Sequence, residues 1–331
     1  MGFLYNLLYD QFFVHPKIPT TLFTDQTIIV SGSNVGLGKE AARHFARLNA
    51  AKVILAVRNL AAGDEAKQDI ESSTGRHGVC EVWHLDMASF ASVKQFAARA
   101  STELVRLDAV VENAGIQTLQ FQLAEGHERT ITVNVISTFL LALLLLPKLK
   151  ETAAVTAPMA NSPRLTIVAS DVHALTDLPE RKEKNTFNAL DKDTKQGMNP
   201  RYWTSKLLEV LVVRELAPRL ARDHSDVILN MLNPGFCHSG LTREVDDTLM
   251  MRALKCILAR PTEEGGRTLV AAAAAGRDSH GTYMSNGVVD DDALSEFVKS
   301  QEGQKTQKKV WKELQGILED IQPGVTNVVE T

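Results

Sequence analysis

The 331-residue sequence predicts an α/β fold, a doubly wound parallel sheet with helices on both faces. Continuous apolar runs of strand length alternate with longer amphipathic segments, and such runs suit parallel strands buried on both faces. The first run leads through a glycine-rich turn into an amphipathic segment, which is how a βαβ unit begins. The most distinctive motifs follow apolar runs, where the carboxyl ends of parallel strands form a binding crevice.

The apolar runs and the segments between them give the elements in order. The predicted strands are 27–30, 52–57, 79–85, 108–111, 164–169 and 227–231, and the predicted helices are about 38–49, 59–73, 89–105, 126–150, 202–222 and 261–276. Neither a linker nor an internal repeat divides this pattern. We therefore expect a single domain over 1–331, with 1–24 as an N-terminal extension.

Composition narrows the function. A net charge of −4 gives no sign of a nucleic-acid surface. Cys80, Cys237 and Cys256 are odd in number and widely spaced, which argues against a disulfide framework and a zinc site. The longest apolar run, 139–146, is interrupted by Pro147 and is too short to span a bilayer, so it reads as a buried helix. We expect a cytoplasmic protein with reduced thiols.

The head of the chain is rich in aromatic residues. Residues 3–14 lack the basic region and the small-residue cleavage site of a signal peptide. We interpret them as a short appended helix that covers apolar surface. The alternative is peripheral contact with a membrane through 3–14.

A glycine turn follows the first predicted strand. Gly32, Gly36 and Gly38 have the spacing G-x-x-x-G-x-G and lead directly into a helix. Glycines let the backbone approach a pyrophosphate closely, and the N–H groups of a helix start favour its negative charge. The same turn can also be a plain strand-to-helix connection.

Tyr202 and Lys206 are separated by three residues, so a helix stacks their side chains one turn apart. An adjacent ammonium lowers the pKa of a phenol and makes its hydroxyl a usable proton donor near neutral pH. Alone, the pair also fits a half-buried aromatic beside a solvated lysine.

Taken in order, the glycine turn, Glu112-Asn113-Ala114-Gly115, Asn134, Ser170 and the Tyr202/Lys206 pair resemble the short-chain dehydrogenase/reductase family over about 27–287. Within it, the sequence is similar to the retinol-dehydrogenase-like and fungal secondary-metabolite reductase branch. The resemblance implies a Rossmann-type sheet and hydride exchange between nicotinamide C4 and a carbonyl carbon.

The resemblance also implies catalytic roles. Tyr202 would donate the proton in reduction, Lys206 would lower its pKa and hold the nicotinamide ribose, and Ser170 would bind the substrate oxygen. Asn134 would position a water that links Lys206 to solvent. The alternatives are a strand-end hydroxyl that satisfies the backbone for Ser170 and a locally bonded amide for Asn134.

The end of the second strand indicates the cofactor. An acid usually binds the ribose hydroxyls of NAD there, but this chain has Val57 and Arg58, which favours NADP(H) unless Arg58 is only solvated. Asp86, beside Met87, resembles an adenine-contacting aspartate, or it caps the helix that starts near Ser89. The predicted cofactor-binding residues are Gly32, Ser33, Asn34, Gly36, Leu37, Gly38, Arg58, Asp86, Met87, Asn113, Ala114, Gly115, Tyr202, Lys206, Pro234, Gly235 and Ser239.

Two loops are open to more than one interpretation. The charged interval 171–200 makes the spacing between Ser170 and Tyr202 longer than is usual in the family. It either shapes the entrance to the substrate site or has no functional role. The Met-rich stretch at about 236–260 is either a substrate lid or core. His173 and His238 lack a spaced partner, so we expect no metal site.

The predicted function is an NADP(H)-dependent oxidoreductase that interconverts a carbonyl and an alcohol on a moderately apolar small molecule, with a polyketide-like intermediate as one candidate. The alternative is a catalytically silent nucleotide-binding scaffold or regulator. In the family, a homodimer often forms through helices equivalent to 126–150 and 202–222.

Overall fold

The computed structural model describes residues 9–156, 162–193, 198–222, 226–238, 240–242 and 258–330. An eight-stranded sheet runs through them in the order β10-β9-β8-β7-β4-β1-β2-β3. Its pairings are parallel except for that of β10 with β9. The predicted doubly wound α/β sheet is therefore confirmed.

The strands lie close to the predicted runs. They are β1 (Thr27–Ser31), β2 (Lys52–Val57), β3 (Cys80–His84), β4 (Ala109–Glu112), β7 (Arg164–Val168), β8 (Ile228–Asn233), β9 (Tyr283–Ser285) and β10 (Val288–Val289), with a separate hairpin of β5 (Leu123–Ala124) and β6 (His127–Glu128). The sequence did not predict β5, β6, β9 and β10, because strands of two or three residues are too short to show a pattern.

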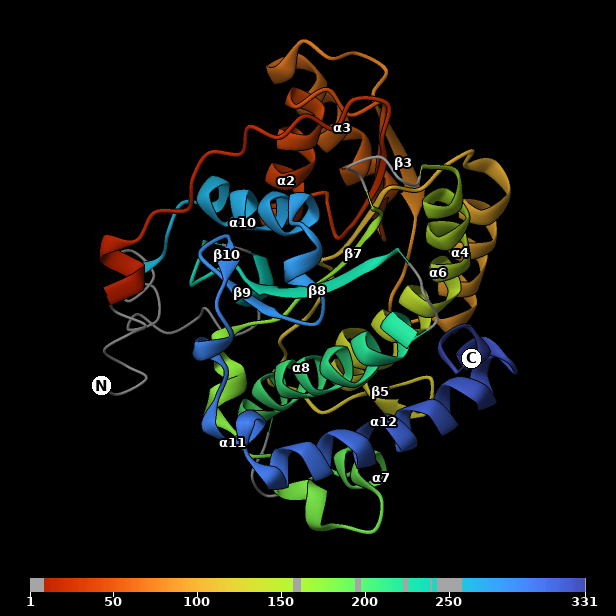
Figure 1. Ribbon diagram of the computed structural model, residues 1–331, viewed down its shortest axis with the longest axis vertical. Coiled ribbons are helices and arrows are strands. Elements are labelled where there is room, and N and C mark those ends of the chain that lie inside the picture. The colour runs from red at the N-terminus through yellow and green to blue at the C-terminus, as the bar shows by residue number, and fades with distance from the viewer. Residues whose placement is uncertain are drawn as a thin grey trace.

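Helices cover both faces of the sheet (Figure 1). One layer holds α2 (Gly36–Arg47), α3 (Leu60–Thr74) and α10 (Thr262–Ala274), and the other holds α4 (Phe90–Glu103), α6 (Ser137–Thr156) and α8 (Asn199–Arg222). Successive side chains of a strand point to opposite faces. Accordingly, Ile29 of β1 packs into one apolar core while Ile28 and Val30 pack into the other.

Shorter elements connect these layers. They are α5 (Arg129–Ile131) and the π-helical η1 (Thr132–Ile136) before α6; η2 (Asp171–Leu175), η3 (Pro179–Lys182) and α7 (Thr186–Leu190) before α8; and η4 (Gly240–Thr242), η5 (Arg277–Ser279), η6 (Asp291–Ala293), α11 (Glu296–Lys299), α12 (Gln301–Ile321) and η7 (Val325–Val329) after it.

The C-terminal helix α12 is an element that the sequence did not predict. It lies against α8 on the side away from the sheet and buries Val310, Trp311, Leu314 and Leu318 (Figure 1). The following η7 contacts both α6 and α8. The two helices through which the family often forms a homodimer, here α6 and α8, are thus partly covered by the chain's own C-terminal segment.

One long apolar helix is buried. Among the described residues, the stretch Arg129–Val155 is apolar and long enough to cross a membrane by composition, but 89% of its apolar window lies inside the fold. It is therefore a core helix, as predicted. Pro147 does not end it, because α6 continues through this residue to Thr156.

Candidate active site

The predicted site residues gather at one edge of the sheet. The glycine turn follows β1, Arg58 follows β2, Asn113 follows β4, Ser170 follows β7 and Pro234 follows β8. Because these strands are parallel, their carboxyl ends meet at the same edge.

The glycine turn adopts a conformation that suits glycine. Gly32 and Gly36 have φ of +66° and +67°. A Cβ on Gly38 would lie 2.5 Å from Nδ2 of Asn113, which donates to the carbonyl of Ser31 at 2.9 Å. The turn and the segment after β4 therefore fit together only with glycine at position 38.

The start of α2 has free hydrogen-bonding capacity. Its N-cap residue is Val35, which makes no side-chain capping bond, and the first turn carries no acidic residue. Ser33 turns its hydroxyl back onto the carbonyl of Val30 at 2.8 Å. The N–H groups of this helix start can thus donate hydrogen bonds to an anion such as a pyrophosphate.

Glu112 is buried beside this turn. Its Oε2 accepts a hydrogen bond from the Ser31 hydroxyl at 3.2 Å, and its Oε1 has no partner within the described residues. The Ser31 oxygen in turn accepts the N–H groups of Asn113 and Ala114, both at 2.9 Å. Burial raises the pKa of Glu112 to about 8, so the carboxyl is mostly protonated at neutral pH.

Tyr202, Lys206 and Ser170 come together where β7 meets α8. Nζ of Lys206 lies 5.7 Å from the centroid of the Tyr202 ring. The Ser170 side chain lies close enough to the phenol to lower the pKa of Tyr202, and Ser170 Oγ accepts the N–H of Val172 at 3.4 Å. Ser170 therefore caps the backbone after β7 and lies beside the phenol, and its role in binding a substrate oxygen stays a prediction.

The pKa of Tyr202 corrects one expectation. Burial raises it above the usual value for tyrosine, and this outweighs the lowering by Lys206 and by Ser170. Glu209, which the sequence analysis missed, also raises it. This carboxylate lies 2.9 Å from Lys206 Nζ, and its only signal in the sequence is its position three residues after the lysine on the same helix.

Asn134 fixes the neighbouring backbone. It lies in the π-helical turn η1, a feature often found at functional sites. Its side chain pairs with both backbone groups of Ile116, at 2.9 and 3.0 Å, and donates to Ser205 Oγ at 2.9 Å. A Cβ on Gly115 would lie 3.3 Å from Asn134 Oδ1 and 4.0 Å from Lys206 Nζ, so the glycine leaves space between the two side chains.

A second group of side chains, also missed, ties the strand ends together. Asp171 accepts from Tyr283 Oη at 2.8 Å and from Asn233 Nδ2 at 2.6 Å. Asn233 also accepts the N–H of Gly235 at 3.1 Å. Burial raises the pKa of Asp171 to about 6. Because Asp171 follows Ser170 and Asn233 precedes Pro234, this group sets the distance between the two loops.

The N-terminal segment reaches the loop after β8. Residues 9–13 are helical, and Gln11 contacts Phe236 and Leu258. Arg260 donates to the carbonyls of Asp10 and Val14. The sequence analysis predicted that the aromatic side chains of this segment cover apolar surface. The described ones do not, because Tyr9, Phe12 and Phe13 are exposed. Residues 3–8 lie outside the described residues.

Part of the loop after β8 also lies outside the described residues. Pro234 and Gly235, with φ of +78° at the glycine, follow the strand as predicted. Ser239 and most of the predicted lid, residues 243–257, are not described. The interval 171–200 is described except for 194–197, and it packs α7 against α12.

Arg58 and Asp86 are the two residues that were predicted to lie near the adenosine part of a cofactor. Arg58 is exposed and has no hydrogen-bond or ion-pair partner among the described residues. Asp86 accepts the N–H of Ala88 at 2.9 Å, whereas Ser89 caps α4. Asp86 thus makes a local turn before the helix and is not its cap. Met87 is buried in the core.

Of the two histidines near the site, His173 has a structural role and His238 is exposed. His173 is buried, its Nδ1 lies 2.8 Å from the carbonyl oxygen of Ser170, and its Nε2 accepts the N–H of Ser295. Burial lowers its pKa. Within the described part of the chain, no cluster of three histidine, cysteine or acidic side chains could hold a metal ion. Cys80 and Cys237 are free and buried.

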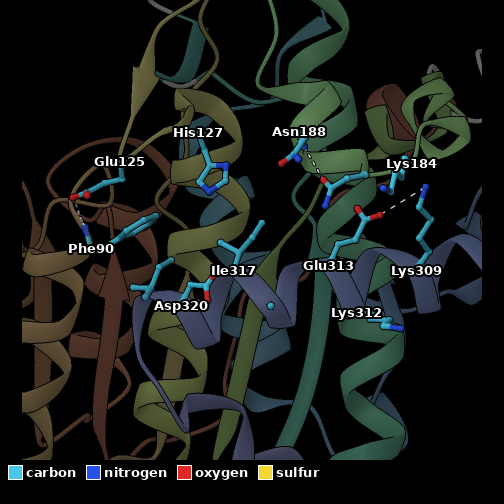
Figure 2. Close-up of a pocket in the computed structure, with 13 residues that line it drawn as sticks. Phe90, Glu125, His127, Lys184, Asn188, Lys309, Lys312, Glu313, Ile317 and Asp320 are labelled. Carbon is cyan, nitrogen blue, oxygen red and sulfur yellow. Dashed lines mark hydrogen bonds and ion pairs between the residues drawn. The ribbon is translucent and has the colours of Figure 1, made fainter.

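A separate hollow lies beside α12 (Figure 2). It is formed by α12, α7 and the β5–β6 hairpin, and none of the predicted site residues lines it. Its polar groups are largely paired: Glu313 accepts the N–H of Thr186, and His127 contacts Asp191. It is therefore not the site of the predicted chemistry.

Known proteins resemble this chain in sequence. Residues 26–156 match the family described as short chain dehydrogenase. Short-chain dehydrogenase anuD of Penicillium roqueforti is 47% identical over 326 residues, which are 97% of this chain and 84% of that protein. Short chain dehydrogenase/reductase dmxR8 of Cryptosporiopsis sp. is 48% identical over 99% of both chains. The chain belongs to the short-chain dehydrogenase/reductase family.

Solved structures show the same fold. The NADPH-bound carbonyl reductase from chicken fatty liver covers 81% of this chain and 99% of its own, with a TM-score of 0.60 and 19% identity. The Pseudomonas aeruginosa RhlG/NADP active-site complex covers 83% and 99%, with a TM-score of 0.60 and 20% identity. At such identities the likeness establishes the Rossmann-type fold of this short-chain dehydrogenase/reductase and nothing finer.

Proposed function

We propose that this short-chain dehydrogenase/reductase is an NADP(H)-dependent enzyme that interconverts a ketone or aldehyde with an alcohol on a moderately apolar small molecule. The observation that carries the proposal is the meeting of Tyr202, Lys206 and Ser170 at the edge that also bears the glycine turn. An alcohol oxygen and a carbonyl oxygen differ by one proton, and this group can supply it.

The residues present fit a dinucleotide. Gly32 and Gly36 open the turn, the uncapped start of α2 can donate hydrogen bonds to a pyrophosphate, and the exposed Arg58 after β2 is available to pair with a 2′-phosphate. When bound, NADPH supplies the hydride from its nicotinamide ring. The two structural relatives above are an NADPH-bound carbonyl reductase and an NADP complex, which supports the same preference.

The protein's own side chains donate the proton and bind the substrate oxygen. Ser170 and Tyr202 donate hydrogen bonds to the carbonyl oxygen, and the phenol gives up its proton as negative charge develops there. Lys206 stabilises the resulting phenolate. The buried surroundings of Tyr202 exclude water, which strengthens the effect of the ammonium.

We also propose secondary metabolism as the setting, with a polyketide-like intermediate as the substrate, because the sequence resembles that branch and its curated relatives are fungal. The test is turnover of apolar ketones such as 2-tetralone and 1-decalone with NADPH and with NADH. We expect NADPH-dependent reduction of at least one ketone. Tight NADPH binding without turnover across a broad panel would support the silent scaffold and contradict the proposal.

A further inference from the structure

Lys206 is held by a carboxylate as well as by the backbone. Its Nζ donates to the carbonyl of Val168 at 2.7 Å and to the two carboxylate oxygens of Glu209 at 2.9 and 3.0 Å. Both side chains are buried, with 7% and 3% of their surface exposed. The ammonium has three N–H donors, and one carbonyl and one carboxylate, whose two oxygens can share an N–H, leave one donor for a further partner.

Helix geometry places Glu209 where it can act on the reacting groups. Tyr202, Lys206 and Glu209 lie at positions i, i+4 and i+7 of α8, so they share one face of the helix. The carboxylate follows the ammonium, which in turn faces the phenol at 5.7 Å from the ring centroid. The ammonium of Lys206 therefore lies between the Glu209 carboxylate and the Tyr202 phenol.

A buried ammonium needs a compensating charge. Burial alone lowers the pKa of Lys206, and Glu209 together with Tyr202 raises it above the usual value for lysine. Among the described residues, Glu209 is the carboxylate that contacts this ammonium. Without it, a neutral lysine becomes the more stable form at a lower pH.

We propose that Glu209 is a positioning residue for the redox chemistry: it is the buried counter-ion that keeps Lys206 charged and directed at Tyr202. This rests on the proposed role of Lys206. Glu209 itself touches neither substrate nor cofactor in this scheme. It acts through the lysine, because a charged lysine both stabilises the phenolate and can bind the nicotinamide ribose.

Other titratable groups approach α8 from neighbouring elements. Asp171 and His173 come from η2, Tyr283 comes from β9, and Glu128 before α5 lies 3.8 Å from Arg201 at the start of α8. On α12, Gln307 bonds Glu215 farther along the helix.

The strand β8 and the turns η1 and η7 bring no titratable side chain. Burial raises the pKa of Glu209 to about 7, and Lys206, which lowers it, is the side chain that opposes this effect. The charge of Glu209 is thus coupled chiefly to that of the lysine.

The test compares the pH dependence of ketone reduction in Glu209→Gln, Glu209→Asp and wild type. Glu209→Gln keeps an acceptor but loses the charge, so the pKa of Lys206 falls. The pKa of Tyr202 falls too, because Glu209 raises it. Both effects move the basic limb of kcat to lower pH, and we expect a shift of about one unit or more and a loss of kcat of about tenfold at pH 8. Glu209→Asp keeps the charge, so its basic limb stays near the wild-type position while kcat falls severalfold.

Glu215→Gln is the matched control, because it removes another carboxylate of α8 that pairs with Arg219 at 2.9 Å, away from Lys206. We expect it to leave the basic limb unchanged. A folded Glu209→Gln with a wild-type limb and kcat would overturn the proposal. Should that variant not fold, a folded Glu209→Asp enzyme whose basic limb shifts by a unit or more would overturn it, because the retained charge should hold the limb in place.

NADPH affinity, followed by its fluorescence, separates this proposal from the proposed function. If wild type binds NADPH but reduces no ketone, the proposed function fails. The role of Glu209 is then decided by binding alone: Glu209→Gln should weaken NADPH at pH 8 more than at pH 6, and equal affinities at both values would overturn the proposal.

Discussion

Gln11 binds the peptide of Phe236 on both sides: its Nε2 donates to the Phe236 carbonyl at 2.6 Å, and its Oε1 accepts the Phe236 N–H at 3.3 Å. The same Nε2 lies 2.6 Å from the carbonyl of Leu258. Phe236 and Leu258 are separated by the loop after β8 and are joined again by the backbone pairing of Cys237 with Arg260. The N-terminal segment therefore holds both ends of this loop.

Gln11→Ala should raise KM for the ketone with a smaller change in kcat. The substitution leaves the Phe236 N–H without the Gln11 acceptor, whereas the Phe236 carbonyl keeps the N–H of Arg260. Each lost hydrogen bond is worth about 0.5–1.5 kcal/mol. We expect a 3- to 30-fold increase in KM, measured by initial rates at saturating NADPH. Phe13→Ser is the control, because Phe13 belongs to the same segment and is 71% exposed.

Deleting residues 1–21 tests whether the nucleotide site needs the N-terminal segment. The nucleotide site should still form, because β1 begins at Thr27, but the loop after β8 loses its support from Gln11 and the Arg260 contacts. We expect NADPH to bind within about threefold of wild type. Loss of the cooperative thermal transition would show that the segment is required for folding.

Tyr202→Phe should abolish reduction while it leaves NADPH bound. The change removes the proton donor, and general acid catalysis is worth about 10²–10⁴-fold in rate. Fluorescence titration should give an NADPH Kd within about threefold of wild type. Tyr283→Phe, which removes another buried hydroxyl, should lower Tm but keep kcat within about tenfold. Near-wild-type turnover by Tyr202→Phe would contradict the assigned role.

Arg58→Leu should reduce the preference for NADPH over NADH. A charge-assisted pair with a 2′-phosphate is worth about 1.5–3 kcal/mol, or about 10- to 100-fold in affinity. Adding Val57→Asp, the obvious companion change, is a poor design, because Val57 is 1% exposed and the new carboxylate would enter the core.

Ratios of kcat/KM for the two cofactors decide this prediction, with Arg222→Leu at the exposed end of α8 as the control. If kcat/KM for NADPH and kcat/KM for NADH are equal in wild type, Arg58 is only a solvated surface residue.

Glu112→Gln should stabilise the protein at alkaline pH. The pKa of Glu112 is raised from 4.5 to about 8 by burial, so the folded state holds a proton that the unfolded state releases. The contribution of this carboxyl to stability is complete below pH 4.5 and is lost as pH rises through about 8.

We expect urea unfolding at pH 8.5 to show Glu112→Gln more stable than wild type by on the order of 2–4 kcal/mol, and the two to be closer at pH 5.5. Glu71→Gln is a useful comparison, because Glu71 is also a buried carboxylate but accepts the N–H groups of Gly78 and Cys80. An equal difference between Glu112→Gln and wild type at both pH values would contradict the raised pKa.

The sequence alone determined the features that depend on neighbours along the chain. The apolar runs predicted the strands from β1 to β8, apart from the short hairpin, because burial on both faces requires unbroken hydrophobic residues. The spacing of Tyr202 and Lys206 placed them on one helix face, since the helical period is fixed. Gly32 and Gly36 were predicted to form the turn, because positive φ favours glycine.

Only the tertiary structure decided the features that join distant segments. Gln11 meets Phe236 across 225 positions, and α12 returns to cover α8. The pairing of Glu209 with Lys206 is local, yet its importance comes from burial, which nothing in the spacing reveals. Burial also decided the raised pKa of Tyr202. Local sequence sets periodicity and turn geometry, but the cost of removing a charge from water depends on everything packed around it.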